Sequence, residues 1–442
     1  MLPTGGGQAW LMVSADAQRD PLQLLLDQET HRLAWLLPVR HSRMAESAFA
    51  YFRGAAAVMA ADLARQPHSG LMVQLCGDAH LLNFGFFGSP ERQLLFGIND
   101  FDETYPGPYE WDVLRLATSF LLAARSNGLS SGEQEAIAAR ALRSYAKAMR
   151  QFASMPFIPM WVARLPLEQL VEERGSRNFR RHLRRVVASA LHRDSRQAVR
   201  KLCETDPNGD LRFRHDPPLL WRHADLPSDL LAGLHWREWV EHLFETYKDT
   251  LRPDMRHFLS RYRLADAALK AVGVGSVGTR CAVGLFVGEH PDDVLVLQSK
   301  QALPSVLAPY LPGPAPDHQG ERVVQGQRLL QTASDVFLGW TRSLLHHDFY
   351  WRHFRDWKGS VEVECLDAEG LTDYARLCGW TLAKAHARSG DRRAIAADVG
   401  PPKAFARRLL ALAEQHAQWA HADHALLLEG IARGQISSSP VV

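Results

Sequence analysis

Six side chains able to bind cations or carry protons gather in one short stretch of the sequence. In QLCGDAHLLNFGFFGSPERQLLFGINDFDET, residues 74–104, they are Asp78, His80, Asn83, Asp100, Asp102 and Glu103. The acidic and amide groups follow apolar runs typical of buried strands. Such polar groups are poorly suited to a protein core. Oxygen ligands from Asp and Asn are those that Mg²⁺ prefers, with water and phosphate filling its other positions. Any one of these residues could instead shape a turn, but turns account poorly for the whole set.

A glycine-rich motif lies almost two hundred residues further along the chain. It reads G-x-G-x-x-G, with Gly273, Gly275, Ser276 and Gly278, and such motifs occur in both dinucleotide-binding and kinase-type folds. A dinucleotide fold needs a helix directly after the glycines, whereas CAVGLFVG at 281–288 favours a strand. We therefore predict a glycine hairpin over nucleotide phosphates, because glycine lets the backbone approach without a Cβ in the way.

The order G-D-x-H-x-x-N, a short strand and D-F-D-E resembles the catalytic and metal loops of the protein-kinase-like superfamily. The closest resemblance is to the aminoglycoside phosphotransferase and choline kinase branch. It implies that Asp78 orients and deprotonates an acceptor hydroxyl, that Asn83 is the second metal ligand, and that Asp100 is the principal Mg²⁺ ligand, with Asp102 as an additional one. Cys76 departs from that branch, which usually has histidine there.

The same resemblance gives roles to residues near the glycine motif. Lys300, at the end of DVLVLQSK, would pair with the α- and β-phosphates of ATP, and Glu321, opening the next predicted helix, would hold that lysine. The alternative for Lys300 is an exposed lysine at a strand end. Because the glycine hairpin follows the catalytic loop here, the resemblance implies a circularly permuted kinase-like fold, since two lobes can pack alike whichever connection is cut.

Three further segments fit this permuted order. Residues near Asp356–Gly359 would form the hinge, with backbone groups facing the adenine. Asp112, in EWDVLRLATS, resembles the aspartate that steadies the catalytic backbone, and His386 lies in a helix resembling the one that precedes the catalytic loop. We interpret Asp112 and His386 as structural.

Nearly the whole chain also resembles a bacterial family known as domain of unknown function 2252. The resembling stretches are FAYFRGAA, SGLMVQLCGDAHLLNFGFFGSPER, INDFDETYPGPYEWDVLRLATS, VGVGSVGTR, LQSKQA and LAKAHARSGD. At Gln301 that family more often has Glu. This resemblance implies little about activity, so the functional hypothesis depends on the motifs.

Composition narrows the classes of partner. The net charge of +2 gives no global attraction to nucleic acid or acidic membranes. Five cysteines without a C-x-x-C spacing indicate neither a disulfide framework nor a structural zinc site. The sequence has no run of about 20 apolar residues, so we expect no spanning helix and a cytoplasmic protein. The predicted partners are a nucleotide and an unknown acceptor; oligomeric state is left open.

The predicted secondary structure changes along the chain, from mainly helical to β-rich and back to helical. We predict an α+β, two-lobed fold with a leader at 1–20, a helical lobe with the catalytic and metal loops at 21–260, a β-rich nucleotide-binding lobe at 261–355, and a hinge with returning helices at 356–442. The strand-like runs 71–77 and 93–98 could pair. The basic run 177–202 is either a solvated helix or a docking surface for an acidic ligand.

The motifs together favour an ATP- and Mg²⁺-dependent phosphotransferase acting on a small-molecule or protein hydroxyl. The same groups could transfer AMP if the nucleotide binds inverted, and a nucleotide-binding pseudokinase is a further alternative. A metal-dependent phosphoesterase would use Asp78, His80, Asn83 and Asp100, although two-metal hydrolases usually want several histidines. A dehydrogenase rests on GVGSVG alone.

Overall fold

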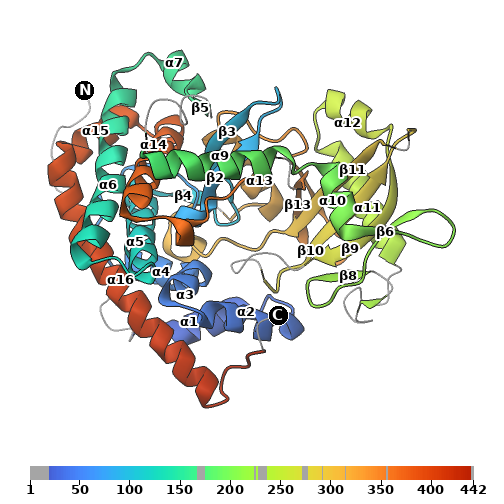
Figure 1. Cartoon of the computed structure of the whole chain (residues 1–442), viewed down its shortest axis with the longest axis horizontal. Helices are drawn as coiled ribbons and strands as arrows, with labels where there is room; N and C mark the ends of the chain where they lie inside the picture. The colour runs from blue at the N-terminus through green and yellow to red at the C-terminus, as the bar shows by residue number, and fades with distance from the viewer. Residues whose placement is uncertain are drawn as a thin grey trace.

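The structure is a computed structural model that describes residues 19–166, 175–222, 225–226, 236–270, 277–290, 292–313, 315–354 and 357–439. It has an α+β fold, as the sequence predicts. Figure 1 shows most of the long helices grouped on one side and the largest sheet on the other, with β2, β3, β4, α9 and α13 between them. The segments that carry the candidate chemistry therefore lie where the two sides meet.

The helical side combines short N-terminal helices with long helices from two distant parts of the chain. Its members are α1 (Pro21–Glu29), α2 (Leu37–Ala45), α3 (Ala48–Gly54), α4 (Ala56–Leu63), α5 (Tyr109–Ser126), α6 (Ser131–Ser154), α7 (Phe157–Val162), α14 (Ala368–Ser389), α15 (Arg392–Val399) and α16 (Pro402–Ala432). The alanine-rich run 47–64 forms the two helices α3 and α4 and not a single one, because Ala55 leaves the helical conformation between them.

Local sequence explains how these helices start and pack. Ser130 and Glu133 form a capping box at the start of α6, so each satisfies a backbone N–H that the helix leaves without a partner. Where α14 crosses α6, a Cβ at Gly379 would lie 2.3 Å from the carbonyl oxygen of Ala141. Glycine thus allows the two backbones to touch, and α5 is buried beside them along almost its whole length.

A six-stranded antiparallel sheet forms the other side, in the order β12-β13-β11-β10-β9-β8. Its strands are β8 (Leu220–Arg222), β9 (Arg263–Lys270), β10 (Cys281–Val287), β11 (Val294–Gln301), β12 (Gly339–Arg342) and β13 (Asp348–His353). The expected strand after the glycine motif is confirmed as β10, which pairs with β9 and β11. A helix does not follow the glycines, so the geometry that a dinucleotide fold requires is absent from this position.

Helices cover both faces of this sheet. On one face, α11 (Trp236–Asp249) and α12 (Pro253–Leu259) pack through aromatic rings, with Phe244 and Phe286 centred 4.5 Å apart. On the opposite face, α10 (Ser195–Leu202) buries Ala198 and Leu202 against Val283 and Val296. The sheet side therefore includes helices that precede residue 261. The basic run 177–202 forms α9 (Arg177–Leu191) and α10, and α13 (Gln319–Leu330) lies beside β12 and β13.

Three small sheets complete the fold. Strand β1 (Met72–Leu75) pairs with β4 (Tyr105–Pro108), β2 (Phe84–Gly88) pairs with β3 (Leu94–Ile98), which also pairs with β5 (Leu165–Pro166), and β6 (Cys203–Thr205) pairs with β7 (Leu211–Phe213). The expected pairing of 71–77 with 93–98 is wrong. The tight turn closed by the Ser89 N–H and the Gln93 carbonyl folds β3 back onto the adjacent β2 instead.

No described helix has both the length and the apolar character needed to cross a membrane.

Candidate functional site

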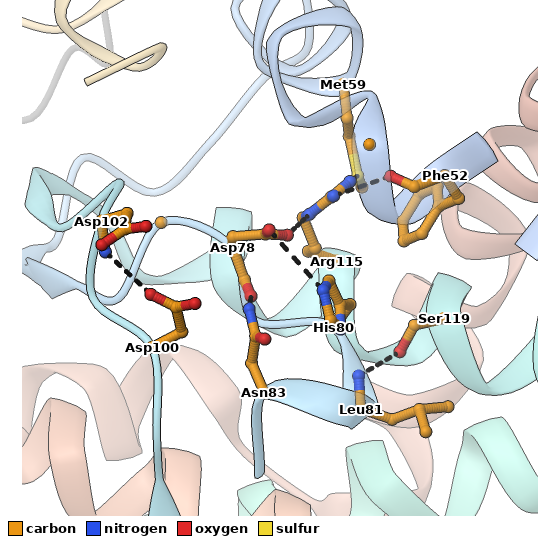
Figure 2. A network of polar contacts seen from close by, with 12 residues as sticks. Phe52, Met59, Asp78, His80, Leu81, Asn83, Asp100, Asp102, Arg115 and Ser119 are labelled. Carbon is orange, nitrogen blue, oxygen red and sulfur yellow. Dashed lines mark hydrogen bonds and ion pairs between the residues drawn. The ribbon is translucent and has the colours of Figure 1, made fainter. Parts of the chain in front are cut away.

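One face of α5 holds the loop that follows β1 (Figure 2). The carboxylate of Asp112 accepts hydrogen bonds from the backbone N–H groups of Cys76 (2.8 Å) and Gly77 (3.1 Å). Seven residues further on, the Ser119 hydroxyl accepts the N–H of Leu81 at 3.0 Å. Residues three, four or seven apart share one face of a helix. The predicted structural role of Asp112 thus has a direct physical basis.

Asp78 projects from this loop and is held by three neighbours (Figure 2). Arg115, also on α5, donates from Nε to Asp78 Oδ1 at 2.6 Å and from Nη2 to the carbonyl of Phe52 at 2.9 Å. The Asn83 amide donates to the Asp78 carbonyl at 2.7 Å. His80 Nε2 lies 3.7 Å from Asp78 Oδ2, but burial lowers the pKa of His80 to about 3, so its ring is neutral. Asp78 is therefore fixed in position with its charge balanced by one arginine.

The loop is also packed tightly against the residues after β3. Gly77 has φ +85°, and a Cβ there would lie only 2.1 Å from the carbonyl oxygen of Glu103. The Glu103 carboxylate accepts the Val306 N–H at 2.8 Å, and the Ser305 hydroxyl donates to the Glu103 carbonyl. Burial raises the pKa of Glu103 to about 7. Glu103 consequently anchors the two loops to each other and does not face the cavity described below.

Lys300, on β11, meets the loop after β3 as the sequence hypothesis requires, but with a different partner. Its Nζ lies 2.5 Å from Asp102 Oδ2 and 3.8 Å from Asp100 Oδ1. The Tyr350 hydroxyl donates to the other oxygen of Asp102 at 2.6 Å. Burial lowers the pKa of Lys300, but the Asp100 and Asp102 carboxylates raise it by more, so the net direction is upward. Lys300 is a charged lysine inside the molecule.

The prediction that Glu321 holds Lys300 is not supported, because the carboxylates that Lys300 contacts are those of Asp102 and Asp100. The next residue on α13 has the structural role. The Arg322 guanidinium donates to the carbonyls of Asp102 (2.9 Å) and Thr104 (2.6 Å), and so ties α13 to the metal loop. A one-residue step along a helix turns a side chain by about 100°, which separates the direction of Glu321 from that of Arg322.

A cavity of about 820 Å³ brings the main candidates together. Asp78, Asn83, Asp100 and Lys300 all line it, although they come from segments far apart in the sequence. Among the described residues its wall also carries a large excess of positive charge. The nine basic side chains are Arg43, Arg53, Arg92, Arg193, Lys201, Lys270, Lys300, Arg352 and Lys358, against the three aspartates Asp78, Asp100 and Asp335. Such a wall attracts polyanions.

Two of these cations lie on the same side as Asp100. Arg352, on β13, donates to Gln298 at 2.9 Å, and Lys358 follows in the loop after β13. The pKa of Lys358 is lowered to about 7, first by burial and then by the positive charge of Arg352. The pKa of Asp100 is lowered: burial acts to raise it, but Lys300 and Arg352 outweigh burial. Asp100 is thus an ionised carboxylate in a cationic wall.

The glycine motif is described only in part. Gly273, Gly275 and Ser276 lie outside the described residues. Gly278 has φ +92°, and its carbonyl accepts the Leu33 N–H at 2.7 Å. A Cβ at Gly278 would lie 3.0 Å from the side chain of Arg32, so this glycine packs against the N-terminal helices and does not line the cavity.

The predicted hinge is wrong for the described part of 356–359. Asp356 lies outside the described residues. Gly359 exchanges two backbone hydrogen bonds with Phe86 of β2, at 2.7 and 3.0 Å. The Trp357 N–H donates to the carbonyl of Arg193, whose side chain in turn donates to the Lys358 carbonyl. These backbone groups are already engaged with the protein, so they cannot face an adenine ring.

The fit of the site to Mg²⁺ can be judged from its oxygen atoms. Asp100 presents an ionised carboxylate to the cavity, and the Asn83 amide, with its nitrogen bonded to the Asp78 carbonyl, has its oxygen as a possible ligand. Both oxygens of Asp102 are engaged, by Lys300 and Tyr350, so Asp102 is not placed as a ligand here. One or two carboxylates plus phosphate oxygens are what Mg²⁺ usually takes. Asp100 and Asn83 therefore fit the ion, in company with a nucleotide.

A metal centre made by the protein alone is not present in the described ranges, where no three His, Cys, Asp or Glu side chains gather to hold an ion. His80 lines the cavity beside Asp78, but within the described ranges it is not part of the histidine-rich cluster that two-metal hydrolases usually have.

Sequence reasoning missed several residues that shape the site. Arg115 and Ser119 follow Asp112 at spacings of three and seven on one helix face, a signal that was readable. Arg53 lies in FAYFRGAA, one of the quoted stretches, with no indication of its direction. Tyr350 and Arg352 are two residues apart on β13 and therefore share one face, and only the pairing with β11 shows that Tyr350 lies opposite Lys300 and Arg352 opposite Gln298.

The comparison with protein families gives one match. The family model described as "Uncharacterized protein conserved in bacteria (DUF2252)" matches residues 32–430, so the chain belongs to this family. No curated protein and no solved structure matches the chain. Because the family description names no activity, any functional conclusion must come from the geometry of the site.

Proposed function

We propose that this DUF2252 member is an ATP- and Mg²⁺-dependent phosphotransferase acting on a hydroxyl group, built as a circularly permuted kinase-like fold. One observation carries the proposal. Asp78, Asn83, Asp100 and Lys300, which the kinase-like resemblance assigns to one reaction, line a single cavity of about 820 Å³ although about two hundred residues separate the first three from the last. Chance packing has no reason to bring this set together at a cationic wall.

The chain's own residues supply positioning and charge, which is most of what phosphoryl transfer needs. Asp78 would orient the acceptor hydroxyl and take its proton as the acceptor oxygen bonds to the γ-phosphorus. The bond from that phosphorus to the β–γ bridging oxygen breaks, and ADP leaves with the electron pair. Arg115 holds the Asp78 carboxylate still, and the Asp112 bonds to Cys76 and Gly77 fix the backbone that carries it.

Lys300 and Arg352 would contact the phosphates of the nucleotide, and this role is supported by their lining the same cavity as Asp100. When bound at Asp100 and Asn83, Mg²⁺ would neutralise charge on the β- and γ-phosphate oxygens. Lys300 reaches those oxygens by loosening its contact with Asp102, which Tyr350 still holds.

The same cavity accommodates two related activities. If the nucleotide binds inverted, AMP is the transferred group, and if Asp78 is held too firmly by Arg115 the protein binds nucleotide without transfer. A phosphoesterase with two metals is less well supported, given the absence of a His, Cys, Asp and Glu cluster in the described residues. A dehydrogenase is not supported either, since strand β10 follows the glycine motif.

The test is a thermal-shift titration with ATP, ADP and NAD, each with and without Mg²⁺. We expect stabilisation by ATP that depends on Mg²⁺ and that Asp100→Asn removes, because ligands that bind only the folded state raise its stability by mass action. Stabilisation by NAD and not by ATP would reject the proposal. Arg65→Gln, an exposed change outside the cavity, is the matched control and should behave as wild type.

Labelled nucleotide then identifies the transferred group. With ATP labelled at the γ-phosphorus, label should reach an acceptor in a cell extract or, slowly, water; with ATP labelled at the α-phosphorus it should stay in ADP. Asp78→Asn should abolish the γ-label transfer while ATP still stabilises the protein. Transfer of the α-label would instead establish AMP transfer, and binding without either transfer would establish a pseudokinase.

A further inference from the structure

The cavity wall next to Asp78 contains an arginine, Arg53, with a buried Nε that has no acceptor among the described residues. Arg53 lies in the last turn of α3 and lines the cavity. Its Nε is buried, and over the described part of the chain it has no hydrogen-bond partner. Its guanidinium carbon lies over the ring of Phe49, 5.9 Å from the ring centroid. Arg115 differs, since its guanidinium is used by Asp78 and Phe52.

This arrangement is unfavourable for the protein alone. Burial lowers the pKa of Arg53, and the charge of Arg43, from α2, lowers it further. Asp78, Glu364 and Glu46 attract Arg53 and partly offset this, but none of them forms an ion pair with it. Buried cationic N–H groups without acceptors cost folding free energy. Such a cost is tolerated where a ligand supplies the missing acceptor.

The position of Arg53 indicates which ligand this is. Lys300 and Arg352, beside Asp100, are where the nucleotide phosphates are proposed to bind, whereas Arg53 and Arg43 belong to the N-terminal helices next to Asp78 and His80. The Asp78 carboxylate attracts the charge of Arg53, and the charge of Arg53 contributes to lowering the pKa of His80. A group bound by Arg53 and Arg43 would therefore be on the acceptor, near the hydroxyl that Asp78 receives.

We infer that the acceptor is itself a phosphate-bearing molecule, whose phosphate is bound by Arg53 and Arg43 while its hydroxyl faces Asp78. Arginine is the residue best suited to a phosphate, because its planar donors match two oxygens at once. A phosphate supplies the acceptor that the Arg53 Nε lacks, and the excess of basic side chains in the wall repels an acceptor that carries an ammonium group. That the phosphate belongs to an acceptor rests on the proposed function. The existence of an anion site rests on the position of Arg53 alone.

The experiment measures the affinity for inorganic phosphate by isothermal titration calorimetry. The protein is first saturated with Mg²⁺ and the non-hydrolysable analogue AMP-PNP, which occupies the three nucleotide phosphate positions. We expect wild type to bind phosphate, and Arg53→Gln and Arg43→Gln each to weaken it about tenfold or more, the usual loss for a charged hydrogen bond. Arg53→Lys should retain part of the affinity, and the control Arg65→Gln should retain all of it.

Three results would overturn the inference: no phosphate binding by wild type up to about 10 mM, equal affinity in wild type and Arg53→Gln, or equal losses in Arg65→Gln. Melting curves are recorded for every variant to show that it is folded. If Arg53→Gln fails to fold, Arg43→Gln, on a different helix, provides the test in its place. Should AMP-PNP not bind, the titration with Mg²⁺ alone still tests Arg53. In that case the proposed function fails while an Arg53-dependent phosphate site survives.

Discussion

The buried pair of Lys300 and Asp102 allows a test that does not depend on knowing the substrate. Lys300→Met removes the cation and leaves the carboxylates of Asp100 and Asp102 facing each other. The Lys300 side chain is 2% exposed and that of Asp102 30% exposed, with 2.5 Å between Nζ and Oδ2. Breaking a fully buried pair costs about 3–5 kcal/mol, and a surface pair about 0.2–1 kcal/mol. This partly exposed pair lies between, so we expect a loss of about 2–4 kcal/mol of unfolding free energy.

A double-mutant cycle isolates the pair. Asp102→Asn alone leaves Lys300 with Asp100 at 3.8 Å, and the double variant Lys300→Met/Asp102→Asn removes both charges. The double variant should therefore be more stable than the sum of the two single losses implies, with a coupling free energy of about 1.5–3 kcal/mol. Equilibrium unfolding in urea, followed by circular dichroism, gives each value from the midpoint and the slope.

An exposed pair from the same chain calibrates the assay. Arg433, the C-cap of α16, and Glu429 within the helix have side chains 2.5 Å apart that are 63% and 50% exposed, and they should couple by about 0.3–0.5 kcal/mol. If Lys300 and Asp102 couple no more strongly than this, the burial argument is wrong. Lys300 would then have no structural reason to lie beside the metal loop.

Three further changes have clear expected outcomes. Gly77→Ala should cost more than about 2 kcal/mol of unfolding free energy, because its Cβ meets the Glu103 carbonyl in a left-handed conformation. Gly70→Ala, with φ +75° but open space around it, should cost only about 1–2 kcal/mol in the same urea assay. Asp112→Ala should lower the unfolding free energy by about 2–6 kcal/mol, since two buried N–H groups lose their acceptor at about 1–3 kcal/mol each, and a loss no larger than that of a surface change would contradict this. The pKa of Lys358 in the folded protein, about 7, lies below its value in the unfolded chain, near 10.4. Between these pH values the unfolded chain therefore binds more protons than the folded protein. The stability of wild type relative to Lys358→Met should consequently rise from about pH 7 to about pH 10, by at most about 1.4 kcal/mol per pH unit. Unfolding curves at several pH values measure this, and a gap that narrows as pH falls below 7 would count against it.

The sequence predicted local structure well where spacing and residue type act within a few residues. The strand after the glycine motif was readable from the residues at 281–287, because valine and phenylalanine favour a strand. Asp112 was readable as a structural support for the loop after β1, and it accepts hydrogen bonds from the backbone of Cys76 and Gly77. The strand that pairs with β3 could not be predicted, because an apolar strand can pair with several neighbours. The tight turn after β2 determines that β3 pairs with β2.

The partners of charged groups were harder to predict. Glu321 was a reasonable partner for Lys300 from its place at the start of a helix, yet the orientation of α13 presents Arg322 to the metal loop instead. The backbone partners of the expected hinge could not be predicted from the sequence either. Nothing in residues 357–359 reveals that Phe86, far away in sequence, takes up the backbone groups of Gly359.

By itself, the sequence determined which chemical groups this protein has and where each lies along the chain: oxygen ligands after β1 and β3, a lysine on β11, and a charge balance near zero. Only the tertiary structure decided which of them meet, that Asp102 and not Glu321 pairs with Lys300, and that nine basic side chains of the described residues line one cavity. The physical reason is the separation along the chain over which each kind of interaction acts. Strand and turn preferences act between neighbours in the chain, whereas ion pairing and burial act between whichever side chains the packing of distant helices and strands brings within a few ångströms.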